Sequence, residues 1–181
     1  MSSLSAEQYD LPLPSRIDRL YVVDDPGVLA ALAADGRARW VLPADAHGFC
    51  RLHQVRLASV RLWLEGARLP DGGTVDVRMA TEASFLDRFG GTSYRSVTKP
   101  LDRDFRYRVS RSDDGSPAWV FPDGAYGHVV WDGVVDEGLA DVSVQPRPFA
   151  EWHVQVSGNA LDLTGLTRVV MQFAGSVSPQ T

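Results

Sequence analysis

Apolar residues recur at every second position along much of this chain, with polar residues between them. This period of two constrains the fold more than any other feature. In residues 59–65, Val60, Leu62 and Leu64 alternate with Ser, Arg, Trp and Glu. The same period recurs in three later segments, at residues 75–79, 105–109 and 152–156. A period of two gives an extended strand one apolar face and one hydrated face, as in an antiparallel sheet that packs on one side.

Turn residues separate these segments at regular spacing. The chain has 18 Asp against 5 Glu, together with 16 Gly and 11 Pro. Asp, Gly and Pro favour tight turns, whereas Glu is a usual residue of surface helices. About eight strands joined by such turns predict an all-β fold, for which we prefer a jelly-roll-like antiparallel β-sandwich. The apolar run 166–173 is predicted to be a central strand, and residues 82–89 a short helix or a loop turn.

One short helix is expected near the N-terminus. Asp25 can cap it, Pro26 suits the first helical position, and Gly36 can end it. Leu29 and Leu32 would then face the core.

The chain length favours one folded unit. Residues 1–15, which include a Leu-Pro-Leu-Pro run, are expected to form an extended N-terminal arm. Residues 16–181 are expected to form a single β-sandwich domain, because no linker or repeat divides them.

Composition excludes several classes of protein. The net charge of -5 and a sequence pI near 5.3 argue against a nucleic-acid-binding surface. No run of 18 apolar residues is present, so no membrane span is expected. No basic segment precedes an apolar stretch, so we expect no signal peptide, and the protein would be cytoplasmic or exported by a dedicated machine.

No catalytic motif stands out, and we predict that the protein is not an enzyme and holds no cofactor. A Gly-x-Ser-x-Gly elbow and a phosphate-binding loop are both missing. The four histidines are scattered and no His-x-His pair occurs, so no metal site is predicted, although Asp-rich turns could offer oxygen ligands to calcium. Cys50, between His47 and His53, is either a reactive thiol or a buried small apolar residue, and we favour the latter.

Aromatic residues are the better candidates for binding. Trp63 falls on the polar face of its strand, whereas Trp119, Trp131 and Trp152 are expected in the core. Flat rings next to polar groups can hold sugars or form the centre of a protein interface. The tentative binding residues are Trp63, Tyr126, His128, Trp131 and His47.

Seven arginines lie on or between the central strands, interleaved with Asp. They could form a basic stripe for an acidic partner or a hydrated face of mixed sign, and the acidic total favours the mixed face. The seven are Arg61, Arg78, Arg95, Arg103, Arg106, Arg108 and Arg111.

Several blocks, in order, resemble the C-terminal β-sandwich region of the A component of bacterial insecticidal Tc toxins. They lie between about residues 40 and 175 and read Trp40-Val41-Leu42-Pro43, His47-Gly48-Phe49-Cys50-Arg51 with 55–64, Pro148-Phe149, 152–156, 162–167 and Val169-Val170-Met171. The resemblance implies an all-β domain from the region that docks the A component onto the B component.

We therefore expect a non-catalytic recognition or assembly module of a bacterial toxin-like system, which binds a partner protein through a sandwich face or its loops. The alternative is a carbohydrate-binding module that takes a glycan. A hydrolase on a jelly roll ranks last. It would need two facing carboxylates, for which Asp76 and Glu65 are the candidates on polar strand faces.

Overall fold

The computed structural model describes residues 15–70, 73–89, 91–97, 100–111, 117–120, 129–130 and 147–178. Within these residues it contains one helix and eleven strands. In chain order they are β1 (Ser15–Val23), α1 (Pro26–Asp35), β2 (Arg37–Val41), β3 (His53–Glu65), β4 (Thr74–Thr81), β5 (Ser84–Phe89), β6 (Thr92–Val97), β7 (Asp102–Arg111), β8 (Pro117–Val120), β9 (Val129–Val130), β10 (Glu151–Ser157) and β11 (Arg168–Ser178).

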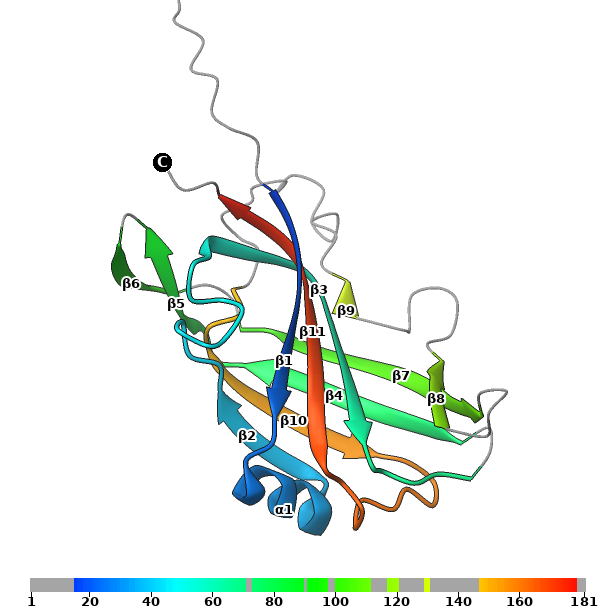
Figure 1. Ribbon diagram of the computed structural model, residues 1–181. Helices are drawn as coiled ribbons and strands as arrows, with labels where there is room; N and C mark the ends of the chain where they lie inside the picture. Colours follow the sequence, from blue (N-terminus) through cyan, green and yellow to red (C-terminus); the bar gives the residue numbers. More distant parts are fainter. Residues whose placement is uncertain are drawn as a thin grey trace, which may run out of the picture.

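Two antiparallel sheets face each other and form a β-sandwich (Figure 1). The four-stranded sheet has the order β1-β11-β3-β9, and the five-stranded sheet has the order β2-β10-β4-β7-β8. Strands β5 and β6 form a separate two-stranded hairpin. The prediction of an all-β antiparallel sandwich is confirmed.

Both sheets pair strands from the start of the chain with strands from its end, since β1 pairs with β11 and β2 with β10. A jelly-roll path requires such pairing. The jelly roll itself stays a prediction, because residues 121–128 and 131–146, which lead to and from β9, lie outside the described residues.

The period-two pattern places its apolar residues between the two sheets. Val60, Leu62 and Leu64 of β3 are completely buried, and the alternating apolar residues of β4 and β10 are buried as well. On β11, Val169, Val170 and Met171 are all buried in succession. This strand lies between β1 and β3, so the prediction of a central strand in residues 166–173 is confirmed, with its start at Arg168.

Aromatic rings bridge the two sheets. The ring of Trp152 on β10 lies edge-on to Phe173 on β11, with centroids 5.5 Å apart. Phe49 contacts both Phe149 and Phe173 in the same geometry at 5.8 Å. The indole N–H of Trp152 donates to the carbonyl of Pro148 at 2.8 Å, so this buried polar group is satisfied. Trp152 is a core residue as predicted, while the side chain of Trp119 and all of Trp131 lie outside what the structure describes.

Helix α1 forms as its sequence predicts. The carboxylate of Asp25 accepts hydrogen bonds from the backbone N–H groups of Gly27 and Val28, and Gly36 ends the helix with a φ of 65°. Leu32 is completely buried and Leu29 packs partly against the core. The helix connects β1 of one sheet to β2 of the other.

One expectation about local structure is wrong. Residues 84–89 form strand β5 and not a helix or loop turn, because Phe85 and Asp87 both turn inward at strand spacing and Asp87 finds buried ionic partners. Strand β1 begins at Ser15, the last residue of the expected arm, and the rest of that arm, residues 1–14, lies outside the described residues. Strand β1 and the β5–β6 hairpin raise the number of strands above the expected eight.

Two glycines with positive φ differ in the space available for a side chain, so they can be compared directly. Gly66, just after β3, has a φ of 88°, and a Cβ there would lie 2.0 Å from the carbonyl oxygen of Gly165. Gly91, in the β5–β6 turn, has a φ of 78° and nothing within 4 Å of its added Cβ.

We expect Gly91→Ala to lower the free energy of unfolding by about 1 kcal/mol, which is the cost of a left-handed alanine. Gly66→Ala adds a backbone clash and should cost at least about 2 kcal/mol more. Urea denaturation of the two variants measures the difference, and equal losses would contradict the tight approach of Gly66 to Gly165.

Candidate functional site

The outer face of the four-stranded sheet displays an apolar row that includes Trp63. Trp63 pairs across the strands with Val170, and Val170 pairs with Val22. Val22 is 41% exposed and Trp63 is half-buried, in keeping with its predicted surface position, while Val170 is covered. We call these three residues the Trp63 row.

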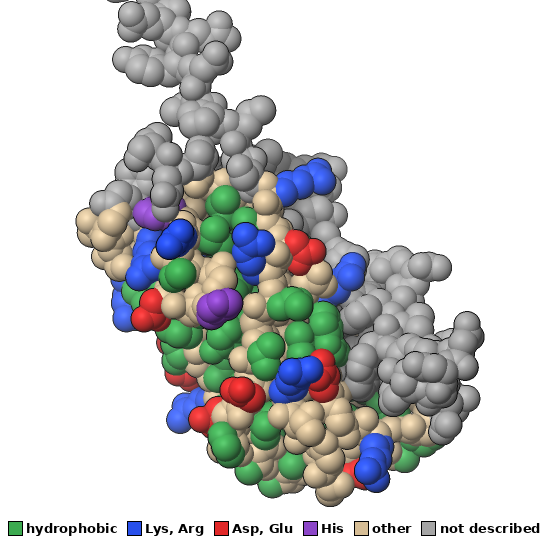
Figure 2. Space-filling model, in the orientation of Figure 1, with side chains coloured by type: hydrophobic (Ala, Val, Ile, Leu, Met, Phe, Trp, Pro, Cys, Tyr) green, Lys and Arg blue, Asp and Glu red, His purple; other side chains and the backbone are tan. Residues whose placement is uncertain are grey.

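Polar groups surround the Trp63 row. Leu20, two residues before Val22 on β1, is 55% exposed and extends the apolar surface along the edge strand. The amide of Gln172 donates to Asp18, and Arg168 pairs with Glu65. Figure 2, in the orientation of Figure 1, shows hydrophobic side chains over β1, β11 and β3 with charged side chains between them. This apolar centre with a polar margin has the composition of a protein interface.

The other predicted binding residues are not brought to this row by anything that the structure describes. His47 is exposed in the loop between β2 and β3. Tyr126, His128 and Trp131 lie outside the described residues.

The expectation that Cys50 is buried is wrong. Phe49 takes the core position in that loop, so the neighbouring Cys50 is left exposed. Its carbonyl accepts a hydrogen bond from Arg88 at 2.8 Å.

The outer face of the five-stranded sheet mixes positive and negative charges. Arg78 donates two hydrogen bonds to Asp102, at 2.9 and 2.6 Å, and Arg106 donates to Asp76 at 2.5 Å. Hydrogen bonding, and then the charge of the same carboxylates, raises the pKa of both arginines. These pairs support the predicted face of mixed sign over a basic stripe.

The two carboxylates considered for hydrolysis do not share a groove. Asp76 lies on β4 and pairs with Arg106, whereas Glu65 lies on β3 in the other sheet and pairs with Arg168. Each carboxylate therefore has its own arginine, and the two-carboxylate geometry that glycoside hydrolysis needs is not formed by this pair.

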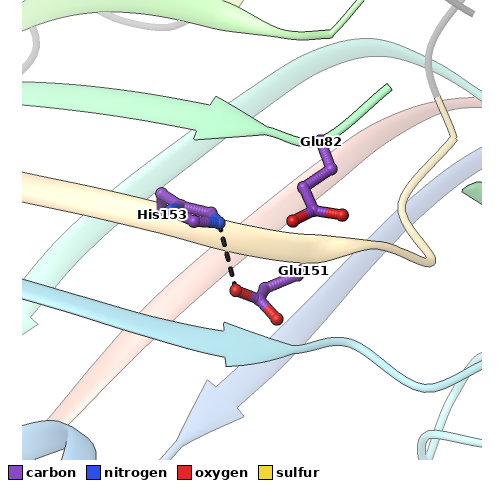
Figure 3. A group of neighbouring side chains, drawn as sticks. All are labelled: Glu82, Glu151 and His153. Carbon is purple, nitrogen blue, oxygen red and sulfur yellow. Dashed lines mark ion pairs between the residues drawn. The ribbon is translucent and has the colours of Figure 1, made fainter. Parts of the chain in front are cut away.

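Sequence reasoning missed a cluster of three possible metal ligands on the outer face of the five-stranded sheet. Glu82, Glu151 and His153 place one ligand atom each within 4.8 Å of one another. Figure 3 shows the three side chains converging from the end of β4 and from β10. The Glu-x-His spacing of β10 is visible in the sequence, but Glu82 is 69 residues earlier and only the strand register brings it close.

A groove of about 760 Å³ lies beside this cluster, between α1 and the outer face of β2, β10 and β4. Its polar lining includes Arg37, Arg39, Arg78, His153 and Gln155. The volume is in the range of small-molecule sites, but none of the described residues that line the groove is Phe, Tyr or Trp. We call it the arginine groove.

A buried ionic cluster ties the β5–β6 hairpin to the sandwich. Asp87 on β5 is completely buried and accepts from Arg56 on β3 at 2.8 Å and from Arg147 at 2.5 Å. Both arginines are nearly buried as well, and one terminal nitrogen of Arg147 has no hydrogen-bond partner among the described residues. Because its members face the protein interior, we expect this cluster to stabilise the fold.

Comparisons of the chain with protein-family models, with curated proteins and with solved structures found no match. The resemblance to the Tc toxin A component therefore stays a prediction. Helix α1, the one helix in the described part of the chain, has ten residues, and no described helix is long and apolar enough to cross a bilayer.

The buried cluster predicts a large difference between two Asp→Asn variants. Asp87→Asn removes the carboxylate that both buried arginines contact and should lower the free energy of unfolding by about 3 kcal/mol or more. Asp76→Asn breaks an exposed pair, so its urea midpoint should stay close to that of the wild type. Denaturation curves of both variants give the comparison, and a wild-type midpoint for Asp87→Asn would show that the cluster does not stabilise the fold.

Proposed function

We propose that this protein is a non-catalytic recognition module that binds a partner protein on the outer face of its four-stranded sheet. The observation behind the proposal is the Trp63 row, which lies next to exposed Leu20 at the edge of that sheet. Tryptophan is among the residues that contribute most to protein interfaces when a partner covers it.

The arrangement of this face favours a protein over a small ligand. The exposed apolar side chains, Leu20 and Val22, lie on edge strand β1, and half-buried Trp63 lies on β3 beyond the covered Val170. Polar neighbours of this row are already paired with one another, as in Arg168 with Glu65 and Gln172 with Asp18. A partner that covered this apolar centre would bury apolar surface, which stabilises an interface. It would not have to desolvate unpaired charges, which costs free energy.

The predicted resemblance gives the class of partner. The blocks similar to the Tc toxin A component run from β2 to β11 and include Trp63 and Val170. We propose that the partner is a protein of a toxin-like assembly, equivalent to the B component that the A component's C-terminal region docks onto.

A glycan is the second candidate ligand. The indole of Trp63 is partly buried, and a sugar could stack on the part of it that is exposed. The arginine groove supports this candidate less, because none of its described lining residues is Phe, Tyr or Trp.

The proposal is tested by co-expressing the tagged full chain with each product of the neighbouring genes and with a Tc toxin B component. We expect one of these proteins to be retained, and Trp63→Ala to weaken its binding at least tenfold, as for a central interface residue. Tyr94→Ala, an exposed aromatic on β6, is the matched control and should bind like the wild type.

Retention of none of these proteins, or equal binding by Trp63→Ala, would overturn the proposal. A glycan array and Trp fluorescence distinguish the second candidate. If no protein is retained, and a glycan binds saturably to the wild type but not to Trp63→Ala, the ligand is a carbohydrate and not a partner protein.

A further inference from the structure

Strand register places three metal-ligating side chains at one point of the five-stranded sheet. On β10, Glu151 and His153 are two residues apart, so both point to the outer face, away from buried Trp152 between them. Trp152 pairs with Thr81 at the end of β4, and Glu82 directly follows Thr81. Glu82 is therefore set beside Glu151 by the sheet itself.

The distances between these groups fit one bound ion. His153 Nε2 lies 3.1 Å from Glu151 Oε1, and the ligand atoms of all three residues lie within 4.8 Å. An ion with bonds of about 2.0–2.2 Å to nitrogen and oxygen holds tetrahedral ligands about 3.4 Å apart. Rotation of the exposed Glu82 side chain would bring its carboxylate toward that separation.

The charges at this point favour a cation. Two carboxylates lie together, and within the described part of the chain Glu82 has no ion-pair partner. Glu151 has Arg39 at 3.7 Å, but the Arg39 side chain is 76% exposed and can move away at little cost.

We propose that Glu82, Glu151 and His153 form a binding site for a divalent transition-metal ion of the Zn²⁺ class. An imidazole with two carboxylates suits Zn²⁺ and its neighbours, whereas Ca²⁺ and Mg²⁺ prefer oxygen ligands only. Three protein ligands leave at least one coordination position open, as in zinc sites that bind a further ligand.

The surroundings indicate what would occupy the open position. His153 and Arg39 both belong to the lining of the arginine groove, together with Arg37, whereas Arg78 of the same lining is already paired with Asp102 and Asp25 caps helix α1. A bound metal ion next to these guanidinium groups would favour an anionic ligand such as a carboxylate or a phosphate. This site lies on the five-stranded sheet, whereas the Trp63 row lies on the four-stranded sheet. The metal-site proposal is therefore independent of the proposed protein interface.

Calorimetric titration of the untagged, chelator-treated full chain with ZnCl₂ tests the proposal. We expect saturable binding of one Zn²⁺ per chain, and at least tenfold weaker binding in His153→Ala and in Glu82→Gln. His47→Ala is the matched control, because this exposed histidine lies in the β2–β3 loop, and its Zn²⁺ affinity should equal that of the wild type.

Two further measurements sharpen the result. Arg39→Ala removes the competing cation from Glu151 and should tighten Zn²⁺ binding by up to about fivefold, the equivalent of an exposed ion pair. Co²⁺ should give visible absorption bands of a site with nitrogen and oxygen ligands, which His153→Ala loses.

All three side chains are on the surface, so we expect the variants to remain folded. Circular dichroism checks this. No saturable binding to the wild type, equal affinity in His153→Ala and Glu82→Gln, or tighter binding of Ca²⁺ than of Zn²⁺ would each overturn the proposal.

Discussion

Packing between Trp152 and Phe173 joins the two sheets, and the remaining architecture depends on that contact. Each ring belongs to a strand in the interior of its sheet, β10 in one and β11 in the other. Phe49 extends the contact from the β2–β3 loop, so the loop is fixed to the same core as the strands. Because the apolar residues of both sheets point toward these rings, their polar neighbours are directed to two outer faces, and these faces are the surfaces available for binding.

The two outer faces differ in chemistry. The four-stranded sheet presents the Trp63 row with polar groups that are already paired, which suits a partner that covers apolar surface. The five-stranded sheet presents arginine–aspartate pairs, the arginine groove and the Glu82–Glu151–His153 cluster, which suit a cation and an anionic ligand. One sandwich thus offers two chemically separate surfaces, because the same alternation that builds the core sorts the other side chains onto opposite sides.

The prediction failed where a charged residue takes a buried position. Asp87 interrupts the apolar pattern of residues 84–89, so the segment did not read as a strand. Asp87 is buried only because Arg56 and Arg147, 31 and 60 residues away, neutralise it. The prediction that Cys50 is buried failed for the opposite reason. Its neighbour Phe49 occupies the core position, and the Cys50 side chain is exposed.

The sequence alone determined the local structure: the capped helix from Pro26 to Asp35, the alternating strands and the inward positions of Leu62, Met79 and Val154. These features depend on residues within a few positions of one another, so propensity and periodicity are sufficient to predict them. Only the tertiary structure decided that Glu82 meets Glu151 and His153, and that Val22 and Val170 lie beside Trp63. Those neighbours come from distant parts of the chain, and their meeting depends on strand order and register, which the whole core fixes together.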